Sequence, residues 1–387
     1  MRNLSDKFLV LALALAGGLW LAGCAATPVE KPLELAGPIF FPAPPDPPRI
    51  QHLLTLSGER DLVPPPSDLQ RYIVGEDKNS GRLMHPYGVA VHDGKMYVAD
   101  ADNHGLATFD LVQRKFHIMT GTGNGRMVRP INVRIEADGT KYVTDPGRSR
   151  VLVYDRNDKY VSALGSEGQF TPVDVALAAD KLYVVDIAHH KVQVLDKHSG
   201  KPLFEFGKLG REPGEFYQPT NISIGPDGNV YVVDANNFRV QRFTSDGRFI
   251  RNYGKAGDDL GTFARPKGIA LDRAGRVYVG DSAFNNVQVF DPSGRLLIFF
   301  GDSDGPEALE LPAGVTIDYD NLEVFRRYAD PKFDLEYVIL VASQSVRNKI
   351  DVFGFGRMSG VEYPPDLPPL SSAAKLDTEA SNTNPVR

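Results

Sequence analysis

Three oxygen-bearing side chains occupy equivalent places in the chain, each two residues after a proline: Asn132, Asp174 and Asn221. Carboxylate and amide oxygens are hard ligands, the kind that Ca²⁺ takes in proteins. A single carboxylate supplies little charge for a divalent cation. The equivalent places in three other segments hold glycine, which we expect to leave open space: Gly88, Gly268 and Gly314. The set predicts a polar, water-filled channel, with a cation site as the alternative.

A second group of carboxylates recurs in a Tyr-x-x-Asp pattern. The five copies are Tyr97 with Asp100, Tyr142 with Asp145, Tyr183 with Asp186, Tyr231 with Asp234, and Tyr278 with Asp281. Five symmetric copies favour a repeated structural role over a catalytic one. We expect each carboxylate to accept backbone N–H groups in a turn. Each tyrosine is a large, partly polar ring suited to packing between neighbouring units.

Other patterns that could carry catalysis do not converge on one site. His189 and His190 are adjacent, so in extended chain they point in opposite directions. The sequence contains no His-Glu-x-x-His segment, and the glycine-rich run 121–125 is not followed by a helical pattern. The residues therefore predict no catalytic residues and favour a protein without enzymatic activity of its own.

The elements that must position these side chains form an internal repeat. Each unit opens on a proline, at Pro86, Pro130, Pro172, Pro219, Pro266 and Pro312. Within a unit, short segments alternate apolar and polar residues and are separated by Gly, Asp, Asn and Ser, which predicts four antiparallel strands. A period of about 45 residues with four strands per repeat is typical of a β-propeller. The sequence therefore predicts an all-β, six-bladed propeller over residues 49–356.

The two ends of the repeat region are complementary. Residues 50–56 resemble the fourth strand of a unit but precede the first complete one, whereas the last unit ends at a third strand, residues 350–353. We expect the N-terminal strand to complete the sixth blade, which would otherwise leave an open sheet edge.

The sixth unit also departs from the others in two ways. It carries an insertion at residues 320–335, with a short helix expected over 322–328, and its signature Asp is replaced by Ser343 or Gln344. The tail 357–387 is rich in Pro, Ser, Ala and Asn, a composition that predicts disorder.

The first 23 residues have a basic start and an apolar middle, which is typical of a secretory signal peptide. The run Leu21-Ala22-Gly23-Cys24 resembles the lipobox of bacterial lipoproteins, and Cys24 is the chain's only cysteine. An uncleaved membrane helix is the alternative. Residues 24–48 are proline-rich and predict an extended spacer that carries the lipidated cysteine. By the same resemblance, Ala25 after the cysteine implies an outer-membrane location in the cell envelope.

The repeats resemble NHL repeats, through Pro-x-x-Ile/Val, through Gly-x-Val-Tyr-Val-x-Asp, and through Val-Gln-Val-Phe at residues 287–290. NHL propellers include binding scaffolds and several enzymes, so the resemblance indicates fold more than function. The formal charge of −6 gives no basis for a nucleic-acid partner. We expect a membrane-tethered binding propeller, with no cofactor, that engages an envelope or secreted protein or a polysaccharide. The alternative, by resemblance to calcium-dependent lactonase propellers, is a metal-dependent lyase or lactonase using Asn132, Asp174 and Asn221.

Overall fold

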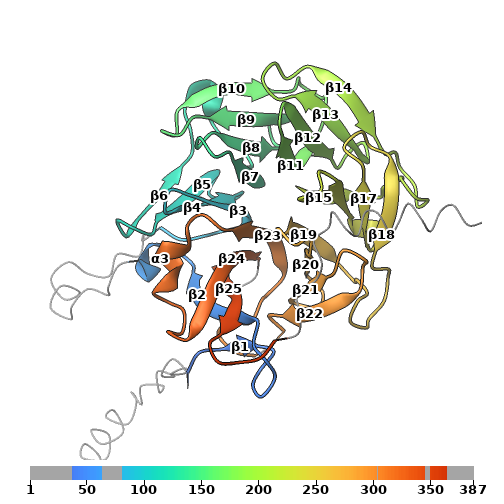
Figure 1. The fold of residues 1–387 in the computed structure, drawn as a ribbon. Coiled ribbons are helices and arrows are strands. Elements are labelled where there is room, and N and C mark those ends of the chain that lie inside the picture. The colour runs from blue at the N-terminus through green and yellow to red at the C-terminus, as the bar shows by residue number, and fades with distance from the viewer. Residues whose placement is uncertain (1–36, 63–80, 303, 345–348, 364–387) are drawn as a thin grey trace, which may run out of the picture. The chain divides into compact units, whose positions relative to one another are not determined.

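The computed structural model describes residues 37–62, 81–302, 304–344 and 349–363. All described strands belong to one compact unit, Pro38–Arg387. They form six antiparallel sheets arranged around a central channel (Figure 1). The predicted all-β, six-bladed propeller is confirmed. Within the described ranges, no helix has the length and hydropathy needed to cross a membrane.

Each of the first five blades is a four-stranded sheet, and its first strand lies innermost. The strands, blade by blade, are β3 (Pro86–His92), β4 (Lys95–Asp100), β5 (Gly105–Asp110) and β6 (Lys115–Met119); β7 (Asn132–Ile135), β8 (Lys141–Asp145), β9 (Arg150–Tyr154) and β10 (Tyr160–Leu164); β11 (Pro172–Ala178), β12 (Lys181–Asp186), β13 (Lys191–Asp196) and β14 (Pro202–Phe206); β15 (Pro219–Ile224), β16 (Val230–Asp234), β17 (Arg239–Phe243) and β18 (Phe249–Tyr253); β19 (Pro266–Leu271), β20 (Val277–Asp281), β21 (Asn286–Phe290) and β22 (Leu296–Phe300).

The sixth blade joins the two ends of the repeat region. Its strands are β23 (Pro312–Asp318), β24 (Phe333–Ser343), β25 (Lys349–Met358), β2 (Ile50–Leu56) and β1 (Phe40–Phe41), in that order from the channel outward. β2 pairs antiparallel with β25, with Leu56 opposite Ile350 and His52 opposite Phe353. The predicted closure of the ring by the N-terminal strand is confirmed.

Two boundaries differ from the prediction. β1 lies inside the predicted spacer 24–48, because Phe41 packs its ring 6.2 Å from both Phe300 and Phe353 and thereby buries apolar surface. β25 runs two residues beyond the predicted end of the propeller at 356, because the long strand β24 still offers backbone partners there, with Phe333 opposite Met358. Farther along the chain, the Tyr363 hydroxyl donates to the Pro48 carbonyl oxygen at 2.7 Å.

The insertion of the sixth blade contains the expected helix, which is shorter than predicted. α3 spans Leu322–Arg326, and its Phe325 side chain is fully buried in the core. The last three residues of the predicted insertion belong to β24. Asn321 Oδ1 accepts a hydrogen bond from the Gly94 backbone N–H of the first blade at 2.8 Å. The insertion therefore ties the sixth blade to the first.

The five signature aspartates are buried and act as expected. Asp281, for example, accepts hydrogen bonds at 2.8 to 3.2 Å from four backbone N–H groups. Those of Ala264 and Arg265 lie in the loop before the blade, and those of Ala283 and Phe284 lie in the turn that follows Asp281. Each carboxylate accepts from the loop that enters its blade, and those of Asp100, Asp186, Asp234 and Asp281 also accept from the turn between the second and third strands. In the sixth blade Ser343 takes this place, since it pairs with Pro312 as the signature aspartates pair with their prolines.

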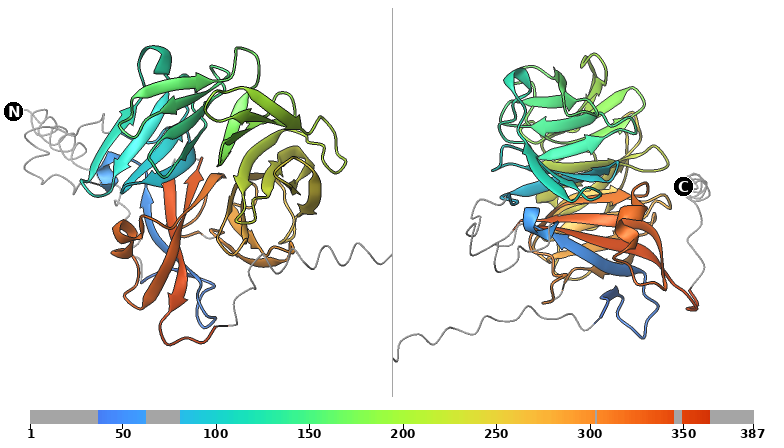
Figure 2. Two further views of the ribbon diagram at one scale, coloured as in Figure 1. Left: turned by 45° about the horizontal axis from the view of Figure 1, so that its top comes forward. Right: turned by 90° about the vertical axis from the view of Figure 1, so that its left-hand side faces the viewer.

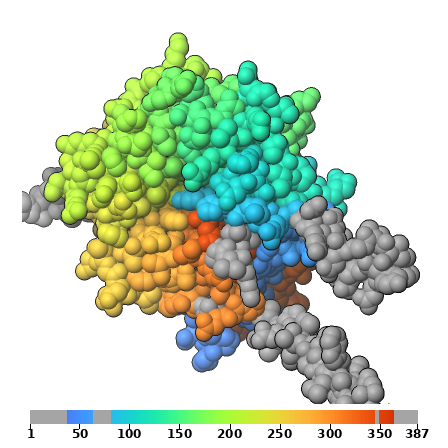
Figure 3. Space-filling view, turned by 180° about the vertical axis from the view of Figure 1, so that it is seen from behind, coloured from blue at the N-terminus to red at the C-terminus, as the bar shows by residue number. Residues whose placement is uncertain are grey.

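The ring has two faces. At the proline end the innermost strands begin, and at the turn end lie the hairpins between the first and second strands of the blades. The 3₁₀ helix η1 (Glu59–Asp61) and α3 mark the two faces, on opposite sides of the ring in Figure 2 (right). Figure 3 views the ring from behind, where the blade colours follow one another around the centre. The channel between these faces positions the candidate site.

Candidate functional site in the central channel

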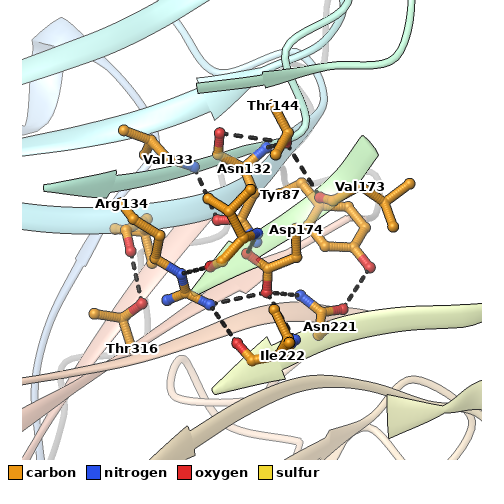
Figure 4. A network of polar contacts seen from close by, with 12 residues as sticks. Tyr87, Asn132, Val133, Arg134, Thr144, Val173, Asp174, Asn221, Ile222 and Thr316 are labelled. Carbon is orange, nitrogen blue, oxygen red and sulfur yellow. Dashed lines mark hydrogen bonds and ion pairs between the residues drawn. The ribbon is translucent and has the colours of Figure 1, made fainter. Parts of the chain in front are cut away.

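The structure joins two of the three predicted channel residues directly (Figure 4). Asn221 Nδ2 donates to Asp174 Oδ2 at 3.2 Å. The third residue, Asn132, turns toward the first blade, because a Cβ on Gly88 would lie 2.0 Å from its Oδ1 atom. Asn132 Oδ1 accepts its hydrogen bond from the next backbone N–H in its own strand, that of Val133, at 2.9 Å. The three residues therefore do not converge on one point.

The partner of Asp174 is Arg134, a residue that the sequence analysis did not single out. Arg134 Nη2 lies 2.9 Å from Asp174 Oδ2, and the guanidinium also donates to the carbonyl oxygens of Val175 and Ile222 at 3.2 Å. The Asp174 side chain is wholly inaccessible to solvent, and that of Arg134 is 20% exposed. Burial raises the pKa of Asp174, and the Arg134 charge opposes this shift. The ion pair balances a carboxylate that the channel would otherwise hold uncompensated.

Asp174 has two further bonds to backbone. Its Oδ2 accepts from the Ile222 N–H at 3.0 Å, and its Oδ1 accepts from the Val175 N–H at 2.8 Å. With Arg134 and Asn221 it therefore has four donors. This side chain connects the second, third and fourth blades across the inner strands β7, β11 and β15.

Tyr87 extends the network across the channel. It lies on β3 in the first blade, and its hydroxyl donates to Asn221 Oδ1 in the fourth blade at 3.0 Å. Burial, with a smaller contribution from the Asp174 charge, raises the pKa of the Tyr87 hydroxyl above its usual range. We call the series of contacts that runs from Tyr87 through Asn221 and Asp174 to Arg134 the channel network.

This arrangement does not fit a calcium ion. The guanidinium of Arg134 occupies a position next to Asp174 Oδ2 that a cation would need, and two positive charges there repel each other. The amide oxygens of Asn132 and Asn221 already accept hydrogen bonds. In the described ranges, no three His, Cys, Asp or Glu side chains gather at a distance suited to a metal. The charges of Arg134 and Asp174 therefore balance each other within the channel network.

The three glycines do not leave the open space that we expected from the sequence. A Cβ on Gly88 would lie 2.0 Å from Asn132 Oδ1, one on Gly314 would lie 2.1 Å from the Tyr87 carbonyl oxygen, and one on Gly268 would lie 2.6 Å from the Ala313 carbonyl oxygen. Glycine is needed there because the innermost strands of neighbouring blades approach closely. The expectation of space was wrong, and these positions serve packing.

The turn end of the channel opens into a cavity of about 580 Å³. Its walls include Ser223, Thr316, Asp318, Asp320 and Asn321, and Arg134 of the channel network reaches it from below. Burial raises the pKa of Asp318, whose carboxylate accepts from the backbone and side-chain nitrogens of Asn321 at 2.9 Å. Residues that begin the insertion thus form one wall of a polar cavity. Such a site can bind hydroxyl or amine groups.

The remaining predicted residues are placed as follows. His189 Nδ1 lies 2.6 Å from the signature carboxylate of Asp186, and His190 accepts from the Gln218 backbone N–H at 3.0 Å. Both histidines thus serve loop contacts. Cys24 and the predicted signal peptide lie outside the described residues.

Comparison with known proteins agrees with this architecture. A family model described as NHL repeat matches residues 216–243. The chain carries an NHL repeat on a six-bladed propeller. Among curated proteins, Peptidyl-glycine alpha-amidating monooxygenase B of Xenopus laevis is 32% identical over 109 residues, which are 26% of this chain and 12% of that protein. Protein brain tumor of Drosophila melanogaster is 31% identical over 89 residues, 22% of this chain and 8% of its own length. The chain thus spans about a tenth of these relatives.

Solved structures show the same fold at low identity. A gluconolactonase from Xanthomonas campestris superposes with a TM-score of 0.54 and 13% identity, over 83% of this chain and 97% of that one. An auxiliary nutrient binding protein from Bacteroides ovatus gives a TM-score of 0.52 and 12% identity, over 71% of this chain and 70% of the other. At this identity the likeness concerns the NHL-type propeller fold alone.

The channel network predicts a large effect of Arg134→Met. Removing one partner of a buried ion pair leaves an uncompensated charge, so we expect the free energy of unfolding to fall by about 3 to 5 kcal/mol in urea titrations. The double variant Arg134→Met/Asp174→Asn removes both charges and should recover part of this loss. Arg156→Met, which removes an exposed arginine paired with exposed Asp93, is the matched control and should change little. A single variant as stable as the control would contradict the structural role of the pair.

Proposed function

We propose that this protein is a non-catalytic binding propeller, tethered by lipid to the bacterial cell envelope, that engages another envelope or secreted protein or a polysaccharide. The main support for the proposal is that the Asp174 carboxylate is already occupied by internal hydrogen bonds. The one carboxylate among the predicted channel residues accepts four hydrogen bonds, one of them from a paired guanidinium. A general base needs a carboxylate free to reach a substrate proton. Asp174 instead holds three blades together.

The turn-end cavity supports a binding role. Its volume of about 580 Å³ lies within the range of small-ligand and side-chain sites in proteins. Asp318 at the end of β23 and Asp320 and Asn321 at the start of the large insertion line its rim with oxygen atoms. Binding residues are commonly grafted on loops that a rigid scaffold positions. We place the partner of the propeller on this face, where a sugar hydroxyl or a protein amine would meet the acidic rim.

The alternative, a metal-dependent lyase or lactonase, is not favoured by the channel residues. Its best support is the fold shared with a gluconolactonase, and a shared fold does not transfer an activity. The residues that would hold the ion are Asn132, Asp174 and Asn221, and each already uses an oxygen for an internal bond. We therefore do not propose this activity.

The tether rests on the lipobox-like run that ends at Cys24. Between this cysteine and the first described residue, Gly37, the sequence has proline at positions 28 and 32. Each acyl CH₂ buried in a bilayer contributes about 0.8 kcal/mol, so two or three acyl chains hold a soluble domain firmly. This anchor would keep the propeller at the membrane, and Ala25 after the cysteine supports the outer one.

Cys24→Ser tests the tether. Cys24 carries the chain's only thiol, so we expect the native chain to incorporate radiolabelled palmitate in growing cells and the variant to incorporate none, as judged by autoradiography. Ala25→Asp keeps the cysteine and is the matched control: it should stay lipidated and shift from the outer to the inner membrane. Absence of label from the native chain, or equal labelling of Cys24→Ser, would contradict the anchor.

Photocrosslinking in intact cells tests the binding face. A photoreactive amino acid at the exposed position Asp320 should capture one recurrent partner, and the same group at Val161, which is 59% exposed on the outer strand β10, should not. Ser223→Trp fills the cavity and is expected to reduce the capture at 320 severalfold. Equal capture at positions 320 and 161, or none at either, would contradict a partner at the turn end.

A further inference from the structure

The proline end of the channel differs from the turn end in its charge. Six residues precede the opening prolines and form the outer ring of this mouth: His85, Arg129, Thr171, Gln218, Arg265 and Leu311. Six residues follow the prolines and form the next ring inward: Tyr87, Ile131, Val173, Thr220, Lys267 and Ala313. Three of these twelve side chains are positively charged and none is a carboxylate. The signature aspartates near this face point into the blades, where they accept backbone N–H groups.

Lys267 is the one charged residue of the inner ring. It is half-buried, and its Nζ contacts a neutral oxygen, Gln344 Oε1, at 3.2 Å. Nζ also lies 5.8 Å from the centre of the Tyr87 ring, which belongs to the channel network below it. Within the described part of the chain, neither Lys267 nor Arg265 forms an ion pair. Burial and the neighbouring charge of Arg265 lower the pKa of Lys267.

The unbalanced charge and the free donors point to a ligand. An ammonium group has three N–H donors, and Gln344 accepts one of them, so two remain. Thr220, the equivalent residue of the neighbouring blade, has a buried hydroxyl oxygen with no hydrogen-bond partner. A partly buried cation without a counter-charge costs free energy, which an anion at this place would offset.

We propose that the proline end of the channel binds the carboxylate group of a small ligand, held by Lys267 with the Thr220 hydroxyl and the Arg265 guanidinium as further donors. Two carboxylate oxygens match the two remaining N–H groups of Lys267, and the Tyr87 ring forms the floor of the site. Gln344 fixes the ammonium group, since its Nε2 in turn donates to the Pro86 carbonyl oxygen at 2.9 Å. This site goes beyond the proposed function, because the channel network separates it from the turn-end cavity.

Competitive labelling of lysines tests the proposal on the full chain. The purified protein is treated with limiting acetylating reagent in the presence of D-galacturonate or of D-galactose, two sugars that differ in a carboxylate. Mass spectrometry then compares the modification of Lys267 with that of exposed Lys255. Galacturonate should protect Lys267 at least threefold and leave Lys255 unchanged, whereas galactose should protect neither. Absence of protection, or equal protection by both sugars, would overturn the proposal.

A variant pair separates binding from folding. A charge-assisted hydrogen bond contributes enough that Lys267→Gln should weaken galacturonate binding about tenfold in calorimetric titration. Lys255→Gln removes a lysine from the loop before the same blade and should bind as the native chain does. Circular dichroism of both variants verifies the fold. Unchanged affinity in a folded Lys267→Gln variant would overturn the assignment. Because Asp320 lies at the other end of the channel, either site can fail without the other.

Discussion

The burial of one negative charge constrains the centre of this propeller. Asp174 is wholly inaccessible, and a carboxylate without partners in such surroundings would cost many kcal/mol. Arg134 supplies the opposite charge, and Asn221 and two backbone N–H groups supply the remaining hydrogen bonds. The same contacts join three blades and, through Tyr87, a fourth. Charge balance and ring packing are therefore satisfied by one set of atoms.

This arrangement divides the channel into two chemically different ends. The turn end has an acidic rim and a cavity bounded by the insertion, whereas the proline end has Lys267 and two arginines without a carboxylate in either ring. The Asp174 carboxylate of the network between them is already occupied by four hydrogen bonds. This division fits the proposed role of the propeller in recognition at its mouths. The rigid ring, closed by β2 on β25, holds those mouths in fixed geometry.

Most of the fold could be predicted from the sequence because the same strand pattern recurs in six units. The opening prolines fixed the number of blades, and the unmatched strand at residues 50–56 indicated how the ring closes. The presence of β1 and the end of β25 at Met358 could not be predicted from the sequence, because they depend on tertiary contacts of Phe41 and of the long strand β24. The glycines misled for a related reason: a missing side chain means space only where no neighbouring backbone fills it.

The candidate site was found only in part. Asp174 and Asn221 were identified by their place two residues after a proline. Their partner Arg134 lies two residues beyond the equivalent position in its own strand, Asn132. The other units have small residues at the place of Arg134: Ala90, Ala176, Ser223, Ala270 and Thr316. A charged residue among uncharged ones was the available signal, and Lys267 gives the same signal one residue after its proline. Pairing across blades cannot be read from the spacing within one blade.

The central claim is that the channel network balances itself and has no place for a hard cation. Calorimetric titration of Ca²⁺ into the purified protein tests this most directly. The account predicts heats of dilution alone, both for the native chain and for Asp174→Asn. Saturable binding of one ion per chain that disappears in Asp174→Asn would contradict it.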